Sequence, residues 1–189
     1  KKFGNNNIKK DLLIINLNGS AGQSLGAFAV KGLKINVNGD ANDYVGKGLS
    51  GATIVVKPPI ESNLISNENT IIGNTVLYGA TSGKLFAAGQ SGERFAVRNS
   101  GAESVIEGCD SNGCEYMTGG CVVILGKIGD NFGAGMTGGM AFVYDINDTF
   151  KYRINEETLI FDKIRSKHWE NVLKAVSYTH LRAHETIPD

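Results

Sequence analysis

Six short apolar runs of this chain each begin at a glycine, and four of these glycines recur at a nearly constant interval. The runs begin at Gly26, Gly51, Gly83, Gly101, Gly120 and Gly139. Subtracting successive positions gives intervals of 25, 32, 18, 19 and 19 residues. A repeat of this length holds about three short strands with a tight turn after each, because a strand advances about 3.3 Å per residue. The pattern predicts the stacked coils of a parallel β-helix.

Glycine content agrees with this prediction. The chain has 25 glycines but only three prolines among 189 residues. Glycine adopts the positive φ that tight corners need, and a shortage of proline leaves the hydrogen-bonded ladders uninterrupted. We therefore predict one all-β domain, a single-stranded right-handed parallel β-helix with a short C-terminal capping helix.

The glycine pattern stops at Asp145 and a charged segment follows. We expect residues 150–154 to form a last edge strand. Beyond it, Trp169, Val172, Leu173 and Val176 recur at i, i+3, i+4 and i+7, which predicts one apolar face of a helix that begins near Ser166. Because the last coil of a solenoid exposes ladder groups and core side chains, we expect this helix to cover the end of the stack.

These patterns divide the chain into four parts. Residues 1–10 are expected to end an upstream linker, 11–154 to form the β-helix, and 155–175 to form the charged extension with its capping helix. Residues 176–189 fit neither pattern and resemble a translated sequencing adapter, so we expect a non-native tail. His180 and His184 have the i, i+4 spacing of a helical zinc site, but they belong to this tail.

Charge and hydropathy exclude two classes of function. The 19 basic and 19 acidic residues balance, so nucleic-acid binding is unsupported. No run approaches the roughly 18 apolar residues of a membrane span, and the first 30 residues lack a secretion signal. We predict a cytoplasmic protein without a membrane partner, and the initial Lys1 suggests a fragment.

Three cysteines, Cys109, Cys114 and Cys121, have a C-x4-C-x6-C spacing that suggests a metal or iron–sulfur site. Tetrahedral zinc sites favour closely paired cysteines with a second pair or histidines, and neither is present here. Cys121 also begins a dense apolar strand, where a small thiol packs as an ordinary core residue. We predict core packing rather than metal binding.

Two segments, 46–51 and 133–138, satisfy the G-x-G-x-x-G pattern of dinucleotide-binding loops. Such a loop follows a strand and opens a helix whose N-terminus receives the pyrophosphate. Here each segment is followed by a strand-like run, so we interpret both as corners of the repeat.

Hexapeptide acyltransferases are a rival interpretation, because the segments 72–77 and 78–83 look somewhat like their repeats. Those enzymes need a general base, usually histidine, yet residues 1 to 167 contain no histidine. For the same reason no serine or cysteine of the coils has a histidine partner for nucleophilic catalysis.

Scattered carboxylates are the remaining candidates for acid–base chemistry: Asp40, Asp43, Glu93, Glu103, Glu107, Asp110 and Glu115. Nothing in their spacing distinguishes them from solvated surface groups. We predict no catalytic, cofactor-binding or metal-binding residue in this chain.

The glycine-cornered segments 108–126 and 129–145 closely resemble the C-terminal GXGXG-repeat domain of the glutamate synthase large subunit. Segments 19–28, 42–51, 73–83 and 92–102 agree with it as well, and the resemblance extends from about Lys10 to Ala175. One departure is Ala52, where the family often repeats glycine.

The resemblance implies an oxidoreductase that makes two L-glutamate from L-glutamine and 2-oxoglutarate in ammonia assimilation. In that family an amidotransferase domain and an FMN barrel with an iron–sulfur cluster perform the chemistry. Electrons come from a small NAD(P)H-oxidising subunit or from ferredoxin. The β-helix itself is a non-catalytic scaffold, so the cysteines here are not expected to bind the cluster.

Two hypotheses therefore remain. The first is the scaffold domain of a large multidomain glutamate synthase, which predicts a flavin-barrel sequence directly upstream in the same frame. The second is a stand-alone non-catalytic β-helix subunit, as in separate glutamate synthase modules or the related subunit of formylmethanofuran dehydrogenases. It predicts a start codon just before Lys1.

Overall fold

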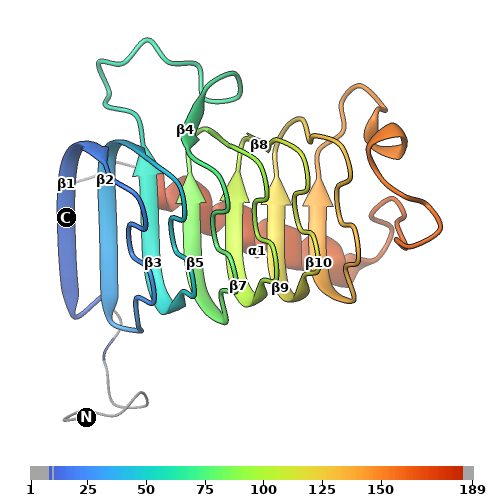
Figure 1. The fold of residues 1–189 in the computed structure, drawn as a ribbon, viewed down its shortest axis with the longest axis horizontal. Coiled ribbons are helices and arrows are strands. Elements are labelled where there is room, and N and C mark those ends of the chain that lie inside the picture. The colour runs from blue at the N-terminus through green and yellow to red at the C-terminus, as the bar shows by residue number, and fades with distance from the viewer. Residues whose placement is uncertain (1–8, 10, 185–189) are drawn as a thin grey trace.

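The predicted parallel β-solenoid is confirmed by the structure, a computed structural model that describes residue 9 and residues 11–184 (Figure 1). Each coil contributes one long strand to a continuous parallel sheet. In stacking order the long strands are β1 (Leu13–Ala21), β2 (Leu33–Ala41), β3 (Ser50–Lys57), β5 (Ser82–Ala87), β7 (Ser100–Ile106), β9 (Thr118–Ile124) and β10 (Gly138–Val143). Short strands β4 (Thr70–Ile72), β6 (Gln90–Ser91) and β8 (Gly108–Cys109) form a second row.

Register determines which residues fill the interior. Ile35, Ile54 and Leu85 lie opposite one another on successive strands, and all three are buried in the core enclosed by the coils. Residues one position further along the strands point to the outer face, because side chains of a strand alternate between its two faces. On this outer face Val55, Phe86, Val105, Val123 and Phe142 form a second apolar row that is also buried.

The third side of each coil is a corner and not a strand. In one coil the φ angles of Thr75, Leu77 and Gly79 are 58°, 59° and 62°. The Thr75 N–H donates to the Glu93 carbonyl of the next coil at 2.8 Å, and the Leu77 N–H donates to the Val45 carbonyl of the previous coil at 2.8 Å. Corners that begin at Ser24, Tyr44, Arg94, Asn112 and Asn131 show the same alternation of positive φ.

The strand predicted to begin at Gly26 is therefore wrong. Residues 26–30 lie in one of these corners, and the apolar residues 76–77 and 95–97 lie in two others. In the corners, hydrogen bonds to the coils on both sides keep every second residue in the left-handed backbone conformation, even where that residue is not glycine. The other five glycine-led strands are present, and among their glycines only Gly101 lacks the expected positive φ.

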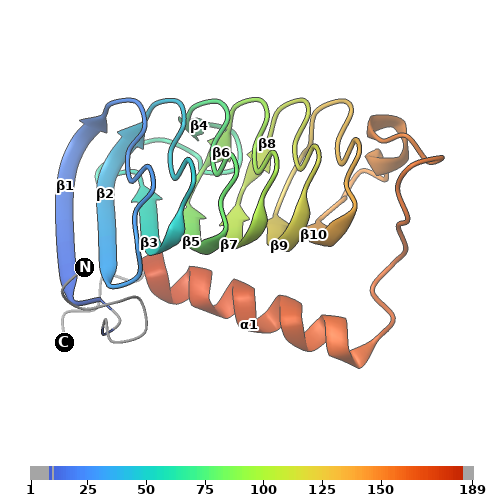
Figure 2. The ribbon, with the colours of Figure 1, turned by 60° about the horizontal axis from the view of Figure 1, so that its bottom comes forward.

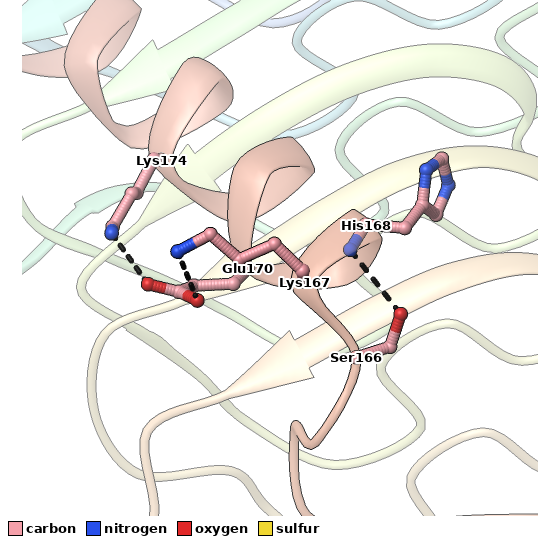
Figure 3. A network of polar contacts seen from close by, with 5 residues as sticks. All are labelled: Ser166, Lys167, His168, Glu170 and Lys174. Atoms are coloured by element: carbon pink, nitrogen blue, oxygen red, sulfur yellow. Dashed lines mark hydrogen bonds and ion pairs between the residues drawn. The ribbon is translucent and has the colours of Figure 1, made fainter.

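Helix α1 (Lys167–His184) confirms the predicted helix and its start. The Ser166 hydroxyl oxygen accepts a hydrogen bond from the His168 N–H at 3.2 Å, as a helix N-cap does (Figure 3). One turn further on, the Glu170 carboxylate accepts hydrogen bonds from Lys167 at 3.1 Å and Lys174 at 2.5 Å. The helix continues unbroken beyond residue 176.

The predicted position of α1 at the end of the stack is wrong. Figure 2 shows the helix along the side of the solenoid, across the long strands from β10 back to β3. Val172, Leu173 and Val176 contact the outer apolar row, and the Trp169 ring meets Phe142 edge-on with centroids 6.2 Å apart. The apolar stripe of α1 therefore covers the outer face of the sheet.

A different segment covers the C-terminal end. Residues 150–154 form no strand, and the 3-10 helix η1 (Phe150–Arg153) lies there instead. Phe150 contacts the ring of Phe132 in the last coil and the ring of Phe161, with centroids 6.2 and 5.4 Å away. The Phe132 N–H donates to the Arg153 carbonyl at 2.9 Å, so the irregular chain after β10 satisfies groups that the last coil exposes.

Candidate functional site

The three cysteines lie in two separate clusters. Cys109 and Cys114 are buried in the core enclosed by the coils, whereas Cys121 contacts the outer cluster beneath α1. No group of three or more histidine, cysteine or carboxylate side chains among the described residues is placed to hold a metal ion. Because the wall of the solenoid separates Cys121 from the other two, these thiols do not fit a shared metal or iron–sulfur cluster.

The raised pKa values of the three thiols agree with a role in packing. Burial raises the pKa of Cys109 to about 12, and the nearby Asp110 charge adds to it against a backbone hydrogen bond from Gly129. Burial and the charge of Glu103 raise the pKa of Cys121 to about 11. Burial also raises the pKa of Cys114. A thiolate is the form that binds metals or attacks electrophiles, and this environment disfavours it.

Neither glycine-rich segment opens a helix. Gly46 and Gly48 lie in a corner that leads into β3, and Gly133 and Gly135 lie in the corner before β10. Their positive φ values, between 62° and 70°, shape the corner. Aromatic rings of neighbouring coils cover Gly48 and Gly135. The Phe28 ring lies 2.5 Å from where a Cβ of Gly48 would be, so the space beside this glycine is filled by the protein itself.

Three of the candidate carboxylates, Asp43, Glu103 and Glu115, contact a neighbouring coil, and Asp110 bonds within its own coil. Asp43 accepts a hydrogen bond from the Asn74 N–H at 2.8 Å, and Asp110 accepts one from the Ser111 N–H at 2.8 Å. Glu103 pairs with Lys84 at 2.7 Å, and Glu115 lies 3.7 Å from Arg94. The structure does not bring these carboxylates together as an acid–base pair.

Pairs of asparagine side chains join neighbouring coils as ladders, which were not predicted from the sequence. The Asn36 side-chain amide donates to Asn16 at 2.8 Å, and Asn38 donates to Asn18 at 3.0 Å in the same register. A third pair joins Asn131 to Asn112 at 2.8 Å. Asparagines separated by one coil length were the pattern from which these ladders could have been predicted.

One shallow, open depression lies between the first two coils and β4. Its lining includes Ser20, Asp40, Asn42 and Thr70, so a candidate carboxylate, Asp40, is located there. It is a surface hollow without a second titratable group in its lining. In addition, no helix within the described part of the chain is both long and apolar enough to cross a membrane.

The fold is a parallel β-solenoid. Its coils have long parallel strands, polar ladders between coils and left-handed corners. Comparison with known proteins gives the family. A family model described as the GXGXG motif matches residues 1–187. The chain belongs to this GXGXG motif family.

Curated relatives are glutamate synthases. The chain is 65% identical over 181 residues to the glutamate synthase (NADPH) large chain of Azospirillum brasilense, covering 96% of this chain and 12% of that protein. It is 52% identical over 180 residues to the ferredoxin-dependent glutamate synthase of Pyropia yezoensis, with 95% and 12% covered. It is 48% identical over 182 residues to the glutamate synthase (NADPH) large chain of Bacillus subtilis (strain 168), again with 95% and 12% covered. The chain thus spans about 12% of the length of these relatives.

Proposed function

We propose that this chain is the structural β-helix domain of a glutamate synthase large chain and takes no direct part in the chemistry. The observation that carries the proposal is the 65% identity to such a large chain along 96% of this sequence. The fold fits this role, because a solenoid whose successive coils are joined by parallel strand pairing is a rigid spacer between other domains.

In this proposal the whole enzyme forms two L-glutamate from L-glutamine, 2-oxoglutarate and two electrons. The amidotransferase domain, the FMN and the iron–sulfur cluster lie in other parts of the same large chain. Its electron donor is a small NAD(P)H-oxidising subunit or ferredoxin, and the enzyme works in the cytoplasm. The buried thiols with raised pKa values, and the carboxylates of Asp43 and Glu103 that contact neighbouring coils, support a scaffold role.

A chimera tests the proposal. In the large chain of Azospirillum brasilense, the matching segment is replaced by residues 11–175, the part that we assign to the native domain. We expect the purified chimera, with its partner subunit, to keep glutamine-dependent glutamate synthesis within about a factor of ten. A matched chimera with Gly120→Val is expected to lose stability and activity together.

The result against the proposal is a well-folded chimera, shown by retained FMN absorbance and normal size, that makes no glutamate. Glutamate synthesis by the 189-residue chain alone would refute the non-catalytic role. Sequencing the native locus separates the stand-alone alternative. A flavin-barrel sequence upstream in frame supports the proposal, and a start codon just before Lys1 supports the separate subunit.

A further inference from the structure

The first coil leaves one edge of the sheet unpaired. Strand β1 pairs with β2 from Leu13 to Ala21, and no other described segment pairs with it (Figure 1). The Leu13 N–H donates to the Gly32 carbonyl on the β2 side. Because alternate residues of a parallel strand direct their backbone groups to opposite sides, those of Ile14, Asn16 and Asn18 point to the free edge.

Interior-facing side chains of this coil are exposed at the same end. Ile15 is 37% exposed, whereas Ile35, its partner on β2, is 5% exposed. Leu13, two residues earlier on the same face of β1, is 58% exposed. The side chains of Leu13 and Ile15 lie on the face of β1 that continues into the core of the later coils. Their exposure therefore marks the end of the hydrophobic core.

Strand β1 also lacks the usual protection of a solvent-facing edge. Its sequence, LIINLNGSA, contains no charged residue and no proline over nine positions. Proteins commonly place lysine, proline or a bulge on exposed edge strands to prevent pairing with other chains. A long, uncharged, apolar edge indicates a surface that is covered in the working protein.

The two ends of the solenoid differ in this respect. At the C-terminal end, η1 and Phe161 cover the last coil, and Arg153 forms an ion pair with Asp130 of that coil. At the other end, the described residues include no equivalent cover. Among the described residues, the chain thus covers the C-terminal end of its core and not the N-terminal end.

We propose that the free edge of β1 and the exposed core residues Leu13 and Ile15 are the docking surface for the body of the large chain that precedes this domain. This inference rests on the proposed function. The partner it fits is an apolar surface that also offers backbone N–H and C=O groups to the edge of β1.

Two observations favour this occupant over a second copy of the domain. The curated relatives devote about nine tenths of their length to segments outside the match, since 12% of each is covered. The surface also lies at the start of the domain, where a preceding segment joins it. A covalently attached partner has an effective concentration in the millimolar range for short linkers, which favours it over a free second copy.

Residue-resolved hydrogen exchange on the full-length protein tests this assignment. We expect the edge-facing amides of Ile14, Asn16 and Asn18 to be as protected as the β2-facing amides of Leu13 and Ile15. A Leu13→Glu/Ile15→Glu double variant is expected to speed exchange of the edge-facing amides at least tenfold. Ile60→Glu, at an exposed isoleucine of the loop 58–69, is the control substitution and should leave β1 unchanged.

Unprotected edge-facing amides in the intact wild-type protein would overturn the inference. This measurement needs no variant, so it decides the matter even if the double variant misfolds, which loss of protection in β7 would show. Protection that grows with protein concentration, together with a dimer in sedimentation, would assign the edge to a second copy and also overturn it. The proposed function fails separately, if the native locus encodes no upstream flavin domain.

Discussion

A coil can require glycine because φ is positive or because there is no space for a Cβ. Four glycines of the solenoid differ in which of these applies, so alanine substitutions at them give a quantitative prediction. At Gly79 φ is +62° and an added Cβ meets nothing within 4 Å. At Gly119 φ lies outside the left-handed region, but an added Cβ would overlap the Ser100 carbonyl oxygen. Gly120 combines a φ of +86° with overlap of the Ala102 carbonyl oxygen, and Gly22 has neither constraint.

The expected losses of unfolding free energy follow from these two terms. A left-handed L-residue costs about 1–2 kcal/mol, and forcing a carbon into a filled space costs about 1–3 kcal/mol. We therefore expect losses of about 1–2 kcal/mol for Gly79→Ala, about 1–3 for Gly119→Ala and about 2–5 for Gly120→Ala. Gly22→Ala is expected to be neutral or to stabilise by up to about 1 kcal/mol, because alanine restricts the unfolded chain.

Urea unfolding followed by far-ultraviolet circular dichroism measures these differences. Fluorescence of Trp169, the one tryptophan of the chain, reports separately on α1. Equal midpoints for Gly22→Ala and Gly120→Ala would refute the reasoning. Equal losses for Gly79→Ala and Gly120→Ala would show that the carbonyl contact adds nothing to the backbone term.

Four further predictions concern other parts of the molecule. Leu173→Glu should release α1 from the outer apolar row, with red-shifted Trp169 emission and unchanged coil dichroism, whereas Asn171→Glu on the exposed side should change neither. Ser104 is buried beside Leu85 and Val122 with no hydrogen-bond partner for its hydroxyl, so Ser104→Ala should stabilise by about 1 kcal/mol; a lower urea midpoint would count against it. Partial burial would raise the pKa of Asp145, but hydrogen bonds from the Phe150 and Thr149 N–H groups and the Thr149 hydroxyl outweigh it and lower the pKa. Stability from this group is thus present above the ordinary carboxyl pKa of about 3.9 and lost at lower pH. Amide exchange at Phe150 should be faster in Asp145→Asn at pH 6 and equal to wild type near pH 2. Because the pKa of Cys109 is about 12 and that of Cys121 about 11, iodoacetamide at pH 8 should modify the unfolded chain much faster than the native one, and equal rates would contradict the burial of these thiols.

The coil period and most long strands could be predicted from the sequence, because glycine spacing and short apolar runs directly reflect the stacking distance. The corners could not. Val76 and Leu77 are as apolar as a strand, yet Leu77 adopts a φ of 59° in a corner. What selects this conformation is hydrogen bonding to the coils before and after it, a non-local effect that leaves no trace in local composition.

The position of α1 shows a similar limit. The apolar stripe that includes Trp169 and Leu173 established that one face is buried but not which surface it meets. A clue lay in the strands: Ile54, Val55 and Val56 are consecutive apolar residues, all buried. Uninterrupted apolar runs are typical of strands covered on both faces, so the outer wall itself required a cover.

The surfaces through which this solenoid can contact another molecule are those that its own described residues do not cover. Helix α1 covers the outer wall, and residues 145–161 cover the last coil. The corners use their backbone groups to bond neighbouring coils, so they offer few groups to a ligand. Within the described part of the chain, the first coil remains uncovered, and the loop 58–69 that projects above β4 exposes Ile60, Leu64 and Ile65 (Figure 1). Both regions expose large apolar side chains, as surfaces that contact another protein do.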